Sequence, residues 1–235
     1  MVDRTEDPIR SNRGAEGRPH RKSSTEPFWS KSWLSVRHVE AFIRKNARLC
    51  RGRGIDYGCG NMPYAGWLRE HANSLIGVDV AQSSESVVDV VIGSGDPLPF
   101  EDDSLDFVVC TQVLEHVSDP ERHLREMARV LQRGGKLLLT LPFVWEQHEV
   151  PHDYYRFTEF GVRHLASQNG LEVVELSAGG GMIECVTQIA VFRLPSFRWL
   201  DPLVFGPVNL LSAVADRLFH MDRITCNWHC VLQKS

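Results

Sequence analysis

A carboxylate followed by two closely spaced glycines is the most informative group of residues in the chain. Asp56 precedes Gly58 and Gly60 at the end of an apolar stretch. Two glycines one residue apart let the backbone turn tightly and approach a ligand without a Cβ in the way. The helix expected after the turn offers unpaired N–H groups and the positive end of its dipole. The pattern therefore predicts a ligand-binding turn at the end of a strand.

Two classes of cofactor compete for such a turn. A dinucleotide fingerprint requires a third glycine, and Pro63 occupies that position. A carboxylate at Asp56 repels a pyrophosphate, but it suits a cofactor that carries a positive amino group. S-adenosylmethionine has that amino group, and a nicotinamide dinucleotide does not. The residues therefore favour S-adenosylmethionine.

A second carboxylate, Asp79, ends the next apolar stretch, 75–79. It lies about 20 residues further on, where an acid at a strand tip accepts the hydroxyls of an adenosine ribose. Alone, Asp79 would be interpreted as a helix cap or a loop residue. Together with Asp56 it favours the ribose role.

The remaining pattern alternates strands with helices around these acids. A helix is predicted over 33–49, before the first strand, and Thr158 has the chemistry of a helix N-cap. This alternation predicts right-handed crossovers and a mostly parallel sheet. The predicted strands are 53–57, 74–80, 87–92, 105–111, 135–141, 171–177 and 225–232, and the other predicted helices are 63–72, 119–132 and 158–168. The apolar stretch 182–221, interrupted by prolines, is predicted to be a helical insertion before the last strand.

Composition limits the domain organisation and the partners. Residues 1–27 hold almost nothing apolar and are predicted to be a disordered leader without a signal peptide, followed by one domain over 28–235. A net charge of −4 argues against a nucleic-acid partner. The six scattered cysteines argue against a disulfide scaffold and for a reducing cytoplasm. Cys226, His229 and Cys230, with His220 upstream, lack the paired spacing of zinc sites, so no metal site is predicted.

The stretch 52–142 resembles the class I S-adenosylmethionine-dependent methyltransferases, in the broad type 11 group related to ubiquinone and menaquinone methyltransferases. The resemblance rests on 55–60, 77–79, 97–100, 105–109, 112–117 and 129–135, in this order and spacing. It implies a doubly wound, Rossmann-like α/β fold whose seven-stranded, mostly parallel sheet has an antiparallel last strand. It also implies a set of cofactor-binding residues, namely Asp56, Tyr57, Gly58, Cys59, Gly60, Asp79, Val80, Gly95, Asp96, Gln112, Val113 and His116.

The stretch 151–161 is similar to one in bacterial methyltransferases of this group, many of them associated with polysaccharide or natural-product biosynthesis. It follows the fifth predicted strand, so its polar groups can overhang the methyl group of the cofactor. We expect His148, Tyr155 and Arg156 to bind the acceptor, and His152 with Asp153 to take a proton from it. The alternative is that Asp153 and Arg156 pair to hold the loop.

These observations predict an enzyme that methylates a small molecule, with O-methylation of a sugar or secondary metabolite as the first choice. C-methylation of a quinone-like or lipid-linked acceptor is the second choice, and a non-catalytic S-adenosylmethionine-binding protein the third. The insertion 182–221 is expected to be a cap over the acceptor, a homodimer face or a peripheral contact with a membrane.

Overall fold

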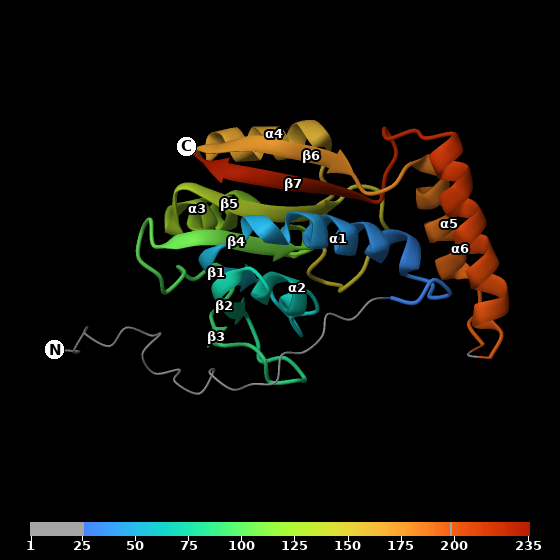
Figure 1. Cartoon of the computed structure of the whole chain (residues 1–235), viewed down its shortest axis with the longest axis horizontal. Helices are drawn as coiled ribbons and strands as arrows, with labels where there is room; N and C mark the ends of the chain where they lie inside the picture. The colour runs from blue at the N-terminus through green and yellow to red at the C-terminus, as the bar shows by residue number, and fades with distance from the viewer. Residues whose placement is uncertain (1–25, 198) are drawn as a thin grey trace.

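The computed structural model describes residues 26–197 and 199–235. The predicted leader, 1–27, lies outside the described residues except for its last two positions. The core is a seven-stranded sheet with the order β3-β2-β1-β4-β5-β7-β6 (Figure 1). Its strands are β1 (Gly52–Tyr57), β2 (Ala72–Asp79), β3 (Val90–Val91), β4 (Leu105–Thr111), β5 (Leu131–Pro142), β6 (Leu171–Ala178) and β7 (Asn227–Lys234).

Helices cover both faces of this sheet. The helices are α1 (Trp33–Asn46), α2 (Ala65–Arg69), α3 (Pro120–Val130), α4 (Glu159–Gln168), α5 (Met182–Arg193) and α6 (Asp201–Leu218), with short 3-10 turns η2 (Ala47–Leu49) and η3 (Leu114–His116). Apolar side chains of α1 and α2 pack on one face of the sheet, and those of α3 and α4 pack on the other. β4 is buried along most of its length because it lies between these layers.

The pairing confirms the predicted fold class. β1, β2, β3, β4 and β5 run parallel, whereas β7 is antiparallel to both β5 and β6. The carboxyl ends of the parallel strands therefore meet at one edge, where ligands bind in open α/β sheets. α5 and α6 stand beyond this edge (Figure 1).

Several predicted boundaries differ from those in the structure. The strand predicted over 87–92 contains only the two residues of β3, because the Gln82 side chain bonds the N–H and C=O of Val88 and takes them away from the sheet. The helix predicted over 63–72 is the shorter α2, since the chain already enters β2 at Ala72. β5 begins at Leu131, before the two glycines where the strand was expected to start.

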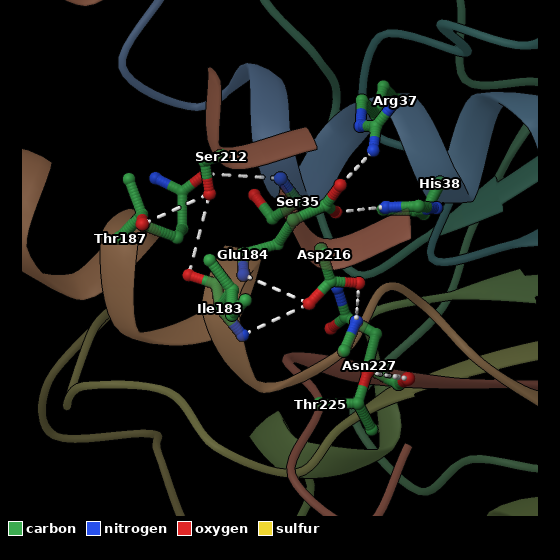
Figure 2. A network of polar contacts seen from close by, with 12 residues as sticks. Ser35, Arg37, His38, Ile183, Glu184, Thr187, Ser212, Asp216, Thr225 and Asn227 are labelled. Carbon is green, nitrogen blue, oxygen red and sulfur yellow. Dashed lines mark hydrogen bonds and ion pairs between the residues drawn. The ribbon is translucent and has the colours of Figure 1, made fainter. Parts of the chain in front are cut away.

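Buried polar contacts fasten the α5–α6 hairpin to the domain (Figure 2). The Glu184 carboxylate of α5 pairs with Arg37 and His38 of α1. The Asp216 carboxylate of α6 accepts hydrogen bonds from the backbone N–H groups of Gly181 and Ile183, at 2.9 and 3.0 Å. Asp216 therefore supplies the N-terminal cap that α5 lacks in its own sequence, because Gly181 has no side chain to accept a bond.

The outer side of this hairpin is apolar and exposed. Leu203, Leu211 and Leu218 of α6 are each about 70% accessible to solvent, at 72%, 70% and 71%. Pro207 lies inside α6 without ending it. Among the described residues, no helix combines the length and the apolar character needed to cross a bilayer.

Candidate functional site

The glycine turn after β1 is joined to the tip of β2. Gly58 and Gly60 have positive φ values of 69° and 50°. The N–H groups of Gly58 and Cys59 donate to the Val78 carbonyl, and the Gly60 N–H donates to Asp79 Oδ2 at 2.8 Å. The two parts of the predicted cofactor site are thus in direct contact.

Asp56 lies buried beneath this turn, with 2% of its surface exposed. Burial, followed by repulsion from Asp79, raises the pKa of its carboxyl to about 7, while Arg69 acts in the opposite direction. A positive group placed beside Asp56 would offset this burial and favour the ionised carboxylate. The amino group of S-adenosylmethionine meets this requirement.

The space in front of the turn is open at one glycine only. A Cβ built on Gly60 would have no atom within 4 Å, whereas one built on Gly58 would lie 2.3 Å from Val113 Cγ2. Gly60 therefore borders a cradle that a side chain would fill, and Gly58 is closely packed against the segment after β4. The residues fit the predicted cofactor.

This contrast gives a pair of matched substitutions. Gly58→Ala should lower the free energy of unfolding by about 2–4 kcal/mol, because overpacking adds to left-handed backbone strain. Gly60→Ala should cost about 1–2 kcal/mol for the strain alone, yet weaken S-adenosylhomocysteine binding by about tenfold or more. Urea denaturation and titration calorimetry measure the two effects. Unaltered ligand binding by Gly60→Ala would show that the cradle lies elsewhere.

Two of the predicted cofactor residues turn their side chains into the core. Tyr57 is buried, and its hydroxyl bonds Nδ1 of His123 on α3. Cys59 is also buried, among the side chains between α1, α2 and the sheet. Any contact of these two residues with the cofactor would therefore come from the main chain, and their place in the cofactor site stays a prediction. Their apolar surface is buried because both flank a central strand.

The residues predicted to meet the adenine of the cofactor are Val80, Gly95 and Asp96, and they differ in exposure and in contacts. Val80 follows the tip of β2 and is 59% exposed. The Asp96 carboxylate folds back onto its own loop and accepts from the Gly93 N–H at 2.9 Å. Gly95 has a φ of 80° and lies beside Arg122 of α3. Asp96 therefore holds the turn that contains Gly95.

The segment after β4 packs against the glycine turn. Gln112 has a φ of 54°, and its amide donates to Thr140 Oγ1 at 3.0 Å. Val113 packs against Gly58. His116 ends η3, where its ring lies edge-on to that of His148, with 4.7 Å between ring centroids.

The segment 143–157, which we call the acceptor loop, is held by Arg156. The guanidinium bonds both oxygens of Asp153, at 2.7 and 2.8 Å, and the carbonyls of Trp145 and Glu146. This ion pair holds the pKa of Asp153 well below its usual range. Asp153 is thus an ionised anchor of the loop.

The predicted partnership of His152 with Asp153 is wrong. Asp153 Oδ2 accepts from the His148 N–H at 3.0 Å and lies 3.6 Å from His148 Nδ1. His152 is exposed, and its Nδ1 lies 3.1 Å from the Tyr154 hydroxyl. The side chains of His152 and Asp153 point in different directions because the chain is extended here, so these neighbours in sequence make no contact with each other. Tyr155 donates its hydroxyl hydrogen to the Ser118 carbonyl.

One residue of the site was missed by the site predictions. Glu115 is fully buried in η3, and neither carboxylate oxygen has a hydrogen-bond partner. Burial raises the pKa of its carboxyl to about 8. Its backbone carbonyl accepts from the Tyr154 and Tyr155 N–H groups, which ties the acceptor loop to η3. The Glu-His pair directly after a buried strand was the available signal.

The cysteines do not gather around a metal. All six are free and buried. His229 packs on Phe42, and burial lowers the pKa of its imidazole to about 3. His220 is instead 3.3 Å from Asp216.

A cleft of about 840 Å³ lies next to the end of the acceptor loop. Aromatic rings of Phe143, Phe160 and Trp228 line it, together with His220 and Arg223. It borders the N-terminus of α4 and the end of β6, beyond the same edge of the sheet as the glycine turn. The cleft offers room for a bulky part of an acceptor.

The sequence of the chain is similar to a known family of enzymes and to individual proteins. Residues 55–139 match the family described as a methyltransferase domain. An uncharacterised protein of Methanocaldococcus jannaschii is 34% identical over 106 residues, which cover 43% of this chain and 48% of that protein. A probable S-adenosylmethionine-dependent methyltransferase of Mycolicibacterium smegmatis is 29% identical over 202 residues, covering 81% of this chain and 74% of the relative.

The fold is also shared with solved structures. The [4+2]-cyclase SpnF superposes with a TM-score of 0.58 at 19% identity, covering 97% of this chain and 91% of that chain. At this identity the likeness concerns the fold alone. The family match, the similar methyltransferases and the fold agree with one another: residues 55–139 are a methyltransferase domain, set in a fold of the class I, S-adenosylmethionine-dependent type.

Proposed function

We propose that this chain transfers the methyl group of S-adenosylmethionine to a hydroxyl of a small molecule. The observation that carries the proposal is the buried Asp56 carboxylate under a glycine turn with open space at Gly60. A ligand with a positive amino group fits this arrangement, and a pyrophosphate does not. S-adenosylmethionine carries its methyl group on a positively charged sulfur. The sulfur leaves as a neutral thioether when the methyl group is transferred, so it is a good leaving group.

In the proposed complex, the two acids bind different ends of the cofactor. Asp56 faces the amino group, and Asp79 accepts the ribose hydroxyls. Each oxygen of Asp79 already accepts one backbone N–H, from Gly60 or Val80. A carboxylate has about four lone-pair sites, so acceptor capacity remains for two hydroxyls. Val80, Gly95 and the segment from Gln112 to His116 complete the proposed walls of the cofactor site.

The acceptor is proposed to lie between the cofactor and the acceptor loop. Alignment of acceptor and methyl group, with exclusion of water, can account for about 7–11 kcal/mol of the barrier. Arg156 and Asp153 keep the loop in place, while His148, His152 and Tyr155 are the groups that can meet an acceptor. His152 is the proposed base, because an exposed imidazole in this loop can accept a proton from an acceptor hydroxyl.

A substitution in the acceptor loop tests this assignment. His152→Ala should leave S-adenosylmethionine affinity unchanged and lower the rate of methyl transfer by about 100-fold. The control is His164→Ala, which removes an exposed imidazole from α4. Labelled methyl transfer to sugar nucleotides, glycosylated metabolites and quinols measures the rate and identifies the acceptor class. Unchanged turnover of His152→Ala would remove it as the base.

The same panel separates the competing functions. Methylation of a quinone-like carbon would support the C-methyltransferase alternative. Binding of S-adenosylmethionine without transfer to any class would favour the non-catalytic alternative. We place the reaction in small-molecule biosynthesis in the cytoplasm, since free, buried cysteines suit a reducing compartment.

The α5–α6 hairpin is proposed to cap the acceptor, because it stands beyond the edge of the sheet that holds the site (Figure 1). Its exposed apolar face fits a second copy of the chain or a lipid surface. Light scattering of the protein in solution and sedimentation with anionic vesicles distinguish these two occupants.

A further inference from the structure

Three metal-binding side chains meet where η3 lies beside the acceptor loop. One ligand atom each from Glu115, His116 and His148 lies within 4.8 Å of the others, the one such group found in 26–197 and 199–235. Glu115 and His116 come from η3, whereas His148 comes from the acceptor loop. The group therefore joins the two segments that border the proposed acceptor position.

The carboxylate of this group lacks a partner. Glu115 has 0% of its side chain exposed, and both of its oxygens are without a hydrogen bond. A buried carboxylate is costly unless it is paired, hydrogen-bonded or coordinated to a metal. Arg156, the cation of the acceptor loop, is taken up by Asp153. The charge of Arg156 still acts on Glu115, but Arg156 makes no bond to it, so both Glu115 oxygens remain free to bind a cation.

Both imidazoles are oriented for coordination through the same nitrogen. Nδ1 of His116 lies 2.7 Å from the His152 carbonyl, and Nδ1 of His148 lies 3.2 Å from the Glu146 carbonyl. Carbonyls only accept, so each Nδ1 donates a hydrogen, and in the neutral form of each ring Nε2 then offers the lone pair. Metal-binding histidines almost always donate their other N–H in this way.

The free nitrogen of His116 faces the acids. It lies 3.8 Å from Glu115 Oε1 and 3.7 Å from Oε2 of the exposed Glu149. Metal bonds of about 2.0–2.2 Å bring ligand atoms to about 3–4 Å from one another. The ligand atoms of the group lie up to 4.8 Å apart, somewhat more than this. His148, with 30% of its side chain exposed, has room to rotate and bring its nitrogen closer to the other two.

We propose that Glu115, His116 and His148 bind a divalent transition-metal ion, with Glu149 at hand as a fourth ligand. Two imidazoles and a carboxylate favour ions such as Zn²⁺, Mn²⁺ or Co²⁺ over Mg²⁺ and Ca²⁺, which prefer oxygen ligands. His116 and His148 are each partly exposed, so the ion is reachable from solvent. Given the proposed function, an oxygen of the acceptor takes the fourth position in place of Glu149, and the ion orients it.

Metal binding can be measured without any acceptor. Tag-free protein, freed of metal with a chelator, is titrated with Co²⁺ while the visible absorption of the ion is recorded, and with Zn²⁺ in a calorimeter. We expect one equivalent to bind. Glu115→Gln and His148→Ala should each weaken binding by at least about tenfold. His164→Ala, the exposed control on α4, should bind like the unmodified chain.

Two results would overturn the proposal. One is the lack of saturable binding at millimolar Co²⁺ and Zn²⁺, and the other is equal binding by the unmodified chain and both site variants. Circular dichroism establishes that each variant is folded, and the conservative Glu115→Gln keeps the shape of the side chain. S-adenosylmethionine affinity is measured on the same samples and tests the proposed function separately. A chain that binds the metal but not S-adenosylmethionine would contradict the proposed function, and the reverse result would contradict the metal site.

Discussion

Asp56→Asn should weaken S-adenosylmethionine binding at pH 8 by about 10–100-fold while making the ligand-free protein more stable. The loss follows from removing a charge-assisted hydrogen bond worth about 1.5–3 kcal/mol. The gain follows from removing a carboxylate that is buried and repelled by Asp79. Titration calorimetry measures the first effect, and urea denaturation measures the second.

The same substitution should change the dependence of stability on pH. The pKa of Asp56 is 3.8 in the reference state and about 7 in the folded protein. Within this window the folded state holds a proton that the unfolded state has lost, so Asp56 lowers the free energy of unfolding by about 1.4 kcal/mol per pH unit as the pH rises. The stability that the protonated Asp56 carboxyl provides is fully present below pH 3.8, and it is lost once the pH has risen past about 7, the pKa in the folded protein.

Asp56→Asn should therefore be less sensitive to pH than the unmodified chain in this window. S-adenosylmethionine should also bind the unmodified chain more tightly as the pH rises toward 8, with release of a proton. Asp222→Asn, which alters an exposed acid, is the control. Equal affinities and equal pH profiles for Asp56→Asn and the unmodified chain would contradict the role of this carboxylate.

Asp216→Ala should lower the free energy of unfolding by about 3–5 kcal/mol, as breaking a buried charged contact does. The Asp216 carboxylate accepts from the N–H groups of Gly181 and Ile183 and lies 3.4 Å from the Glu184 N–H. Removing it leaves these donors without partners at the start of α5, where a negative charge also complements the helix dipole. Urea denaturation gives the free energy.

Two further variants sharpen this prediction. Asp216→Asn keeps an acceptor oxygen and should lose less than half as much stability, whereas the exposed Asp222→Ala should stay within about 0.5 kcal/mol of the unmodified chain. A loss for Asp216→Ala as small as that for Asp222→Ala would mean that the contacts in Figure 2 do not hold the hairpin.

The sheet was predictable where burial alone determines the pattern. β4, covered on both faces, is apolar except at Asp106 and Thr111, and its predicted and observed bounds coincide. The N-cap at Thr158 also followed from local chemistry, because its side chain accepts from a backbone N–H within its own turn. The edge strand β3 was harder to predict, since a side-chain amide from another segment decides where its pairing stops.

The site was predictable only in its local parts. Asp56, the glycine turn and Asp79 follow a sequence pattern, and β1 pairs directly with β2 to bring them together. The pairing of Asp153 with Arg156 was the alternative that the sequence offered, three residues apart in one loop. The isolation of Glu115 instead depends on how the acceptor loop folds back over η3, and nothing in the local sequence determines that path.

The two ends of the 182–221 segment lie side by side. Met182 donates its N–H to the Met221 carbonyl, and Gly179 donates to the Asn227 carbonyl at 2.8 Å. Because β6 and β7 are already neighbours in the sheet, a short link could replace everything between these bonds without changing the register of the strands. The hairpin is therefore a module that could be exchanged as a unit. If it caps the acceptor as proposed, its exchange would alter the acceptor preference and leave the site of the methyl donor intact.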